Sequence, residues 1–208
     1  MNPIVKQKSD QAIQILKEKG LDLWLTFVRE TSAVQDPVLP LVYGDSSLTW
    51  QSALIFTASG EKLAIVGRFE VETAQKTGAF DRVIPYDESI QPVLIEAIKR
   101  INPSQIGINI SEEDYMADGL THGMYQNLMK MLDGTDYRDR TTSAEYVISA
   151  LRGRKTPGEI KRIQTAIQST LEIYNFAFSR IKLGMTEIEV ASLMQAEVTH
   201  RGLDYAWS

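Results

Sequence analysis

Histidines and acidic side chains are the residues of this sequence whose spacing could support metal or acid–base chemistry. The chain has two histidines, His122 and His200. His122 follows Asp118 by four residues in a glycine-flanked segment, so the two side chains can approach one metal ion. A protein metal site usually needs three or four ligands, and a local cap or surface turn is therefore the favoured interpretation. His200 lies beside Gly202 at a predicted helix end, where a protonated imidazole favours the negative end of the helix dipole.

Motifs that identify several large enzyme classes do not occur in the sequence. It contains no Gly-x-x-x-x-Gly-Lys-Ser/Thr phosphate loop, no Gly-x-Gly-x-x-Gly fingerprint and no Gly-x-Ser-x-Gly nucleophile elbow. Cysteine is also absent. Its absence excludes a disulfide framework and a thiolate metal site, and it suits a reducing cytoplasm.

Composition is that of an ordinary globular protein. The 208 residues are 43% hydrophobic with a formal net charge of −5, which is enough chain for one full domain and part of another. The first twenty residues are charged throughout and lack the apolar core of a signal peptide. No apolar run approaches the roughly 18 residues of a membrane span. Mild acidity argues against a general affinity for nucleic acid. We expect a cytoplasmic protein without nucleic-acid or membrane partners.

Strands and helices alternate along the first 150 residues. Apolar periodicity and glycine or proline stops predict helices at 3–19, 69–76, 91–101, 121–132 and 143–151, and strands at 21–28, 52–56, 63–66, 82–85, 105–110 and 137–140. Ser59-Gly60 joins the second and third strands, most simply as a hairpin. The alternation predicts an α/β fold in which helices cover a mixed sheet as a three-layer sandwich.

Two helices with explicit start signals make up the last quarter of the chain. Thr156-Pro157-Gly158-Glu159 and Thr186-Glu187-Ile188-Glu189 both fit a capping box. Glycines 184 and 202 are expected to end the helices, and 203–208 is predicted to begin a strand. One apolar stripe runs along the first of these helices, at Ile160, Ile163, Ile167, Leu171, Tyr174, Phe178 and Ile181. We interpret the stripe as core that a sheet would cover and, if left bare, as a surface that drives association.

The boundary between two domains is predicted near 152–157, where glycine and proline interrupt a run of positive charge. It separates a domain at 1–150 from a segment at 151–208. The cations Arg152, Arg154 and Lys155 could contact an anion or a nucleic acid. The favoured interpretation is a solvated hinge whose cations pair with carboxylates across the domain interface.

The order of these features resembles a known superfamily. Arg152, Lys155, Glu159 and Ile160, then Ala166, then the Gly184-x-Thr186-Glu187 turn resemble the opening of the "pita-bread" domain of the creatinase and Xaa-Pro aminopeptidase superfamily. Residues 1–150 then resemble its N-terminal domain. The resemblance implies the N-terminal portion of a metallopeptidase that cleaves peptides with proline second. A metal-free creatinase-like amidinohydrolase and a non-enzymatic interaction module remain alternatives, since fold analogy alone does not choose among them.

The resemblance also implies that catalysis lies elsewhere. In the peptidases of this superfamily, an Asp, Asp, His, Glu, Glu set on later strands holds two divalent metal ions, Mn, Co or Zn. No residue of this sequence inherits such a role, and Asp204 precedes the first of those strands. We therefore expect no metal ligand, no catalytic residue and no peptidase activity in this chain, and two divalent ions in a full-length parent.

Substrate access is the contribution that the resemblance leaves open. In relatives the N-terminal domain packs against a neighbouring subunit and can lend side chains to the partner's active-site mouth. This implies a homodimer that acts on peptide substrates. The loop after the first strand supplies the candidates Phe27, Arg29 and Asp36. Arg29 can hold a carboxylate by a bidentate contact, and Phe27 can form a wall for a proline-like ring. The alternative is that Arg29 and its neighbour Glu30 are simply exposed loop charges.

Two features limit what the relatives imply about individual side chains. This loop lacks the Asn-x-x-Tyr-Leu-x-Gly run that is common after that strand in better-known relatives, so they say little about the substrate. Trp24, Trp50 and Trp207 are expected in the core and are assigned no function.

Overall fold

The computed structural model describes residues 3–205, and these divide into two compact units between Thr156 and Pro157. Trp207 and the end of the strand predicted at 203–208 lie outside the described residues. Within 3–205, no helix is long and apolar enough to cross a membrane.

A six-stranded mixed sheet forms the centre of the first unit. Its order is β4-β3-β2-β1-β5-β6. β2 is antiparallel to β1 and to β3, and every other neighbouring pair is parallel. The hairpin predicted through Ser59-Gly60 is confirmed. The carboxyl ends of the five parallel strands therefore lie along one edge of the sheet. The strands are β1 Leu23–Val28, β2 Ser52–Thr57, β3 Lys62–Gly67, β4 Arg82–Tyr86, β5 Ile106–Ile108 and β6 Thr141–Ser143.

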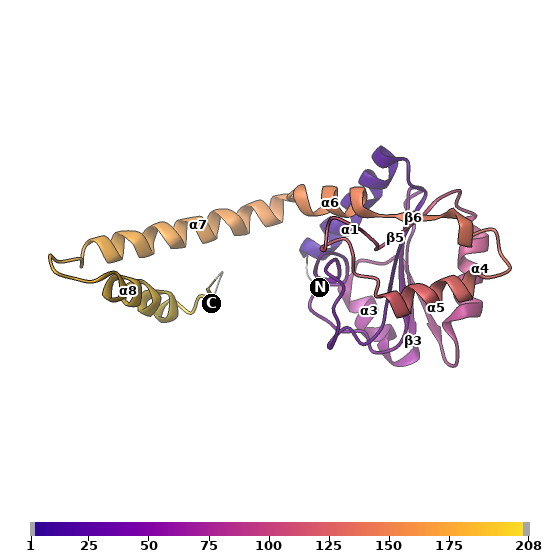
Figure 1. Ribbon diagram of the computed structural model, residues 1–208, viewed down its shortest axis with the longest axis horizontal. Helices are drawn as coiled ribbons and strands as arrows, with labels where there is room; N and C mark the ends of the chain where they lie inside the picture. The colour runs from indigo at the N-terminus through magenta and orange to yellow at the C-terminus, as the bar shows by residue number, and fades with distance from the viewer. Residues whose placement is uncertain (1–2, 206–208) are drawn as a thin grey trace. The chain divides into compact units, whose positions relative to one another are not determined.

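Helices cover both faces of this sheet, which confirms the predicted three-layer α/β sandwich (Figure 1). Alternate side chains of the strands point to opposite faces. Trp24 and Phe56 pack with α1 Pro3–Lys19, α3 Val71–Thr77, α6 Glu145–Gly153 and the short α2 Leu39–Val42. Leu25 and Ile55 pack on the opposite face with α4 Ile90–Ile101 and α5 His122–Leu132.

A buried lysine joins the first helix of this unit to its last. Lys8 on α1 is fully buried, and its Nζ donates to the carbonyl oxygens of Leu151 at 2.6 Å and Arg154 at 2.7 Å. These carbonyls belong to the end of α6, where helix geometry leaves acceptors without partners. The ammonium group therefore caps α6 and fixes its end against α1.

The basic segment at the end of α6 pairs with acidic side chains of the same unit. Arg154 contacts Glu18 at 2.6 Å, and Arg152 lies 3.9 Å from Asp114. The predicted pairing with carboxylates is thus present, although these partners belong to the first unit rather than to an interface.

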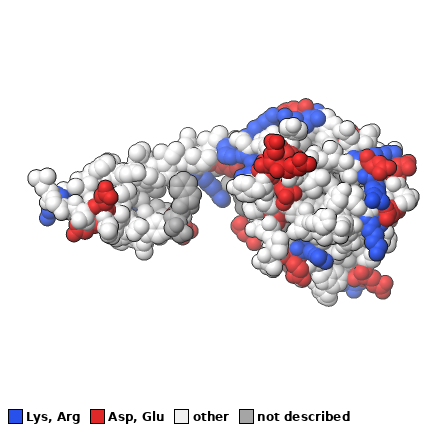
Figure 2. All heavy atoms as spheres, viewed as in Figure 1, with Lys and Arg blue, Asp and Glu red and all other residues white. Residues whose placement is uncertain are grey.

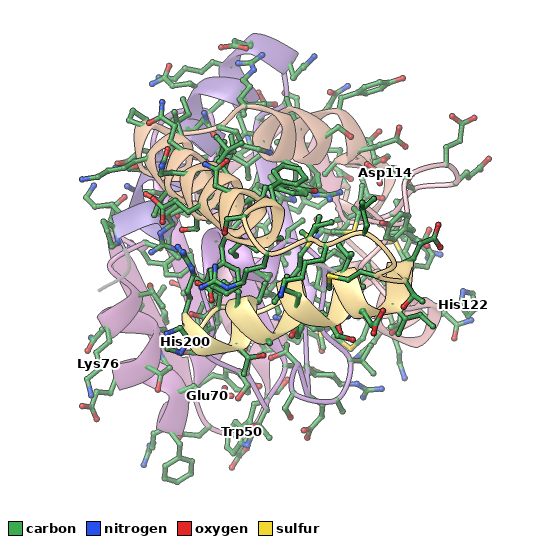
Figure 3. The ribbon with its side chains drawn as sticks, turned by 90° about the vertical axis from the view of Figure 1, so that its left-hand side faces the viewer. Trp50, Glu70, Lys76, Asp114, His122 and His200 are labelled. Carbon is green, nitrogen blue, oxygen red and sulfur yellow. The ribbon has the colours of Figure 1, made fainter. Side chains whose placement is uncertain are left out.

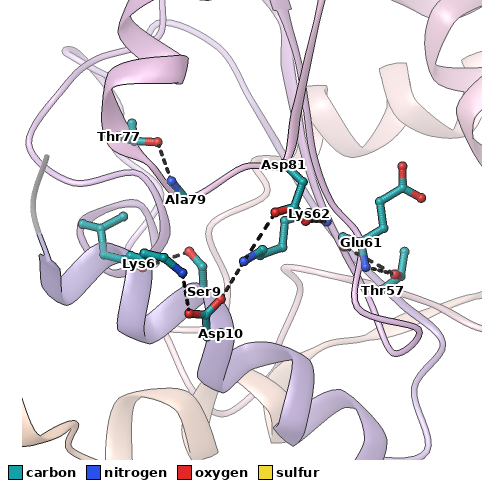
Figure 4. A network of polar contacts seen from close by, with 10 residues as sticks. Lys6, Ser9, Asp10, Thr57, Glu61, Lys62, Thr77, Ala79 and Asp81 are labelled. Carbon is teal, nitrogen blue, oxygen red and sulfur yellow. Dashed lines mark hydrogen bonds and ion pairs between the residues drawn. The ribbon is translucent and has the colours of Figure 1, made fainter.

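A second polar network joins α1 to the sheet (Figure 4). Lys62 on β3 is largely buried, and its Nζ lies 2.6 Å from Asp10 and 3.7 Å from Asp81. Lys6 contacts the other oxygen of Asp10 at 2.9 Å. Burial acts to raise the pKa of Asp10, but the hydrogen bonds from Lys62 and Lys6 outweigh it and hold that pKa below its ordinary value.

The strand predicted at 137–140 is wrong. Residues Arg138–Arg140 form a 3₁₀ helix, closed by a hydrogen bond from Arg140 N–H to the Tyr137 carbonyl oxygen. The strand begins at Thr141, where the backbone first pairs with β5.

The second unit is a pair of helices, α7 Pro157–Phe178 and α8 Glu187–His200. The capping box at the start of α8 is confirmed, because Thr186 Oγ1 accepts from Glu189 N–H while the Glu189 carboxylate accepts from Thr186 N–H at 2.7 Å. α7 ends at Phe178, five residues earlier than predicted, since Arg180 and Ile181 N–H both turn back to the Ala177 carbonyl oxygen. Residues 203–205 are not in a strand.

The apolar stripe of α7 is exposed in this unit. Ile173 and Ala177 are buried, whereas the side chains of the stripe are between 43% and 66% exposed: Ile160, Ile163, Ile167, Leu171, Tyr174, Phe178 and Ile181. Few charged side chains lie on the face of this unit seen in Figure 2. Within the described residues, the stripe is therefore not covered as core. It forms the bare apolar face that we expected in the absence of a covering sheet.

We expect the chain to self-associate through this stripe. Contiguous exposed apolar surface favours association, so the mass measured by light scattering after size exclusion should exceed 23.4 kDa and rise with protein concentration. Replacing Ile167 and Leu171 by lysine should shift the population towards monomer. Replacing Gln164 and Gln168 by lysine is the matched control, because both lie on the same helix but outside the stripe. This change should leave the mass unchanged. A chain that stays monomeric at every concentration would contradict the expectation.

Candidate functional site

A small pocket lies where the carboxyl ends of β1 and β5 meet. In open sheets, ligands bind beyond the carboxyl ends of parallel strands, so a binding site is expected at this edge. Two segments line it, the loop at 29–38 after β1 and the loop at 109–121 after β5. The pocket has a volume of about 130 Å³, and its lining residues are Phe27, Val28, Arg29, Glu30, Val34, Gly119, Thr121 and Met124.

Two of the three side chains predicted from the sequence meet at this pocket. Phe27 is 2% exposed, packs into the core on the side of α5 and is one of the residues that line the pocket. Arg29 follows β1 and is exposed. Among the described residues, its guanidinium has no ion pair or hydrogen bond to another side chain. The arrangement places a free planar cation beside an apolar surface, which suits a ligand that carries a carboxylate next to an apolar group.

The backbone around Arg29 is held by a neighbouring loop. Glu30 and Thr31 N–H donate to the carbonyl oxygens of Thr49 and Leu48 at 3.1 and 2.8 Å. Glu30 has a φ of 47°, a left-handed conformation that is uncommon for a side chain of this kind. Glu70, which lies beside Trp50 in Figure 3, accepts the Trp50 N–H at 3.3 Å and also the Thr49 N–H. Three segments of chain thus fix the position of Arg29 Cα.

The third predicted residue, Asp36, is a structural group rather than an exposed one. It is 2% exposed and does not line the pocket. Its Oδ1 accepts the Val38 N–H at 2.9 Å, and its Oδ2 accepts from Asn109 Nδ2 at 2.8 Å. The interpretation of Asp36 as a substrate-access side chain is therefore corrected, because a carboxylate occupied in this way has no free surface for substrate.

Asn109 is the centre of this buried network. Its Oδ1 accepts the indole N–H of Trp24 at 2.7 Å, and its Nδ2 donates to Thr26 Oγ1 at 3.2 Å as well as to Asp36. The backbone carbonyl of Asn109 accepts the Leu120 N–H at 2.9 Å. One amide thus connects β1, the 29–38 loop and the 109–121 loop.

Gly119 allows the two loops to approach each other. A Cβ built on Gly119 would fall 2.2 Å from the carboxylate carbon and from one oxygen of Asp36. This is closer than non-bonded atoms approach a Cβ in proteins. No side chain other than hydrogen fits at this position, since the Asp36 carboxylate is held by two hydrogen bonds. Gly119 is also part of the pocket wall, so the pocket and the buried network share one boundary.

Charge and burial act together on Asp36. Burial of the carboxylate is the larger cause and raises its pKa, and the nearby negative charge of Asp118 raises it further. The hydrogen bonds from Val38 and Asn109 oppose this without cancelling it.

Acidic residues dominate the next cavity along this edge, beyond β5 and β6. Its volume is about 490 Å³, and its charged lining residues are Glu112, Glu113, Asp118 and Glu145. Asp118 and His122 both line a further cavity of about 360 Å³. The imidazole Nε2 of His122 lies 3.0 Å from the Gln126 amide nitrogen. Across 3–205, no group of three or more acidic or histidine side chains could hold a metal ion. A two-metal peptidase centre therefore does not fit the described residues.

Sequence patterns do not single out the residues that build this site. Asn109, Gly119 and Glu70 carry no motif, and their partners are tens of residues away in the sequence. The available signals were a polar residue directly after the short apolar strand 106–108 and a glycine in the loop that follows it.

Known protein structures share this fold. An Xaa-Pro dipeptidase from Bacillus anthracis matches with a TM-score of 0.59 at 19% identity, over 95% of this chain and 49% of that chain. An X-Pro aminopeptidase from Thermotoga maritima MSB8 matches with a TM-score of 0.57 at 20% identity, over 93% and 49%. A proline dipeptidase from Streptococcus pneumoniae TIGR4 matches with a TM-score of 0.52 at 19% identity, over 71% and 98%.

The extent of these matches bears on the whole protein. The chain spans about half the length of the first two proteins. No family model and no curated protein sequence matches it. At such identities the likeness establishes the fold, namely that of the N-terminal part of Xaa-Pro dipeptidases and aminopeptidases.

Proposed function

We propose that this chain is the N-terminal portion of an Xaa-Pro-type metallopeptidase, an aminopeptidase or dipeptidase that cleaves peptides with proline at the second position. The observation that carries the proposal is the extent of the fold match, which covers 93–95% of this chain and about half of each peptidase. The match continues beyond the first unit, as expected if the second unit opens a catalytic domain.

The first unit serves substrate access in this proposal. Arg29 supplies a cation for a substrate carboxylate, and Phe27 with Met124 supplies an apolar wall of the pocket. Because both loops extend beyond the strand ends, the pocket can face the active-site mouth of a second subunit in a cytoplasmic homodimer. The chain itself contributes no catalytic group.

Metal chemistry belongs to the rest of the parent protein in this account. Two divalent ions there, Mn, Co or Zn, would lower the pKa of a bound water and polarise the scissile carbonyl. In this proposal no residue of this chain takes part in that step.

The coding sequence beyond Ser208 tests this proposal. We expect it to continue for about as many residues again and to encode an Asp, Asp, His, Glu, Glu set on successive strands. A continuation that lacks those five side chains would favour a metal-free amidinohydrolase or a non-enzymatic relative. A stop codon directly after Ser208 would overturn the peptidase proposal.

A further inference from the structure

Two buried oxygen atoms of the first unit have no hydrogen-bond partner among the described residues, Tyr43 Oη and Glu70 Oε2. Tyr43 follows the short helix α2 and is 2% exposed, and its ring packs against Phe80 with 6.3 Å between the centroids. Glu70 lies directly before α3. Burying a polar atom without a partner is unfavourable, and nearly all buried polar atoms in folded proteins are paired. Each of these two oxygens is therefore expected to have a partner in solution.

The Tyr43 hydroxyl and the Glu70 carboxylate are close enough to act on each other. Burial is the larger cause that raises the pKa of Tyr43 above its ordinary value, and the negative charge of Glu70 raises it further. The hydroxyl therefore keeps its proton and can donate, whereas a carboxylate oxygen accepts. The two groups do not form a direct hydrogen bond with each other. A ligand that accepts from the hydroxyl and donates to the carboxylate would satisfy both.

We infer that one buried water molecule binds between Tyr43 Oη and Glu70 Oε2, where it accepts from the hydroxyl and donates to the carboxylate. Buried waters typically bind polar groups that lack a protein partner, and a cation in this place would leave the hydroxyl proton unpaired. A cavity of about 380 Å³, lined by Tyr43 and by Thr73 one helical turn after Glu70, brings solvent beside the site. The inference concerns the first unit alone and stands whether or not the parent protein is a peptidase.

Glu70 connects this water site to the loop that carries Arg29. Its other oxygen, Oε1, accepts the Trp50 N–H at 3.3 Å and also the Thr49 N–H. The Thr49 carbonyl oxygen in turn accepts the Glu30 N–H at 3.1 Å. The water holds the second carboxylate oxygen and so restricts rotation of the side chain, which keeps Oε1 directed at the two amides. The tyrosine therefore supports the loop through the water.

A high-resolution crystal structure of the whole chain tests the site directly. We expect a water within hydrogen-bond distance of both Tyr43 Oη and Glu70 Oε2, present also in Tyr86→Phe and lost in Tyr43→Phe. Tyr86 is the matched control, because the charge of Glu70 acts on it too, but its hydroxyl donates directly to the Gln51 carbonyl oxygen at 2.7 Å. A direct hydrogen bond between Tyr43 and Glu70, a site without water, or a water that persists in Tyr43→Phe would overturn the inference.

Stability and hydrogen exchange provide a second test in solution. If the water bridges the pair, Tyr43→Phe removes a hydrogen bond and should lower the denaturant midpoint. Removing a hydroxyl that has no partner should instead leave the midpoint unchanged or raise it. The Glu30 amide should also exchange faster in Tyr43→Phe, relative to the Leu120 amide on the 109–121 loop. A midpoint that does not fall, or equal changes in the two exchange rates, would count against the bridge.

Discussion

Replacing Gly119 by alanine is expected to lower the free energy of unfolding by about 3 kcal/mol, the upper part of the usual range for an overpacked core. The added methyl group would fall 2.2 Å from the Asp36 carboxylate. That carboxylate cannot retreat without breaking its hydrogen bonds to Val38 and Asn109. Urea or guanidinium unfolding followed by tryptophan fluorescence measures the change.

Gly123 provides the matched control for this substitution. It lies only four residues away at the start of α5, and a Cβ there would meet no atom within 4 Å. Since alanine is a better helix former than glycine, Gly123→Ala should leave stability unchanged or raise it by up to about 1 kcal/mol. Equal effects of the two alanines would show that the two loops are not in close contact.

Replacing Asn109 by alanine is expected to cost a similar amount, about 3 kcal/mol. The substitution removes three hydrogen bonds and leaves the Trp24 indole N–H and the Asp36 carboxylate buried without this partner. Each unpaired buried polar group costs about 1–3 kcal/mol. The same denaturant titration provides the measurement.

An exposed amide is the control for the Asn109 substitution. Gln126 on α5 is exposed and its amide forms a surface hydrogen bond with His122, so Gln126→Ala should change stability by less than about 0.5 kcal/mol. Asn109→Asp should be worse than Asn109→Ala at neutral pH, because it places a second carboxylate against Asp36. A loss below about 1 kcal/mol for Asn109→Ala would contradict the proposed network.

Local patterns predicted most of the fold because the elements carry their own signals. The helix at 3–19 ends at Gly20, whose φ is 70°, and the helix at 71–77 ends at Gly78, whose φ is 68°. The strands 52–57 and 62–67 are apolar runs separated by a glycine turn. Periodicity and turn residues are sufficient in such segments, since both act over a few residues.

One error arose where distant pairing decides the structure, and another where the backbone turns locally. The strand at 141–143 exists because its backbone pairs with β5, more than thirty residues earlier, so the segment 137–141 alone could not show where it begins. The end of α7 at Phe178 depends on a local turn of the backbone, although the apolar spacing continues to Ile181.

The candidate site was predictable only in part, for the same reason. Phe27 and Arg29 could be placed because they end a clear strand, and loops at strand ends often carry function. Asp36 was a substrate-access candidate because it lies in the loop that follows the same strand. Its burial follows from Asn109 and Gly119, which lie 73 and 83 residues later in the chain and reach it only through the pairing of β1 with β5.

Binding of a proline-containing dipeptide to the whole chain tests the central claim, that the pocket beside Arg29 receives a peptide carboxylate. NMR titration with Ala-Pro should shift amide signals of 27–34 and 119–124, with a dissociation constant of about a millimolar for this partial site. Arg29→Met, or the dipeptide amide that lacks the carboxylate, should abolish these shifts. Shifts that appear elsewhere, or that persist in Arg29→Met, would contradict the account.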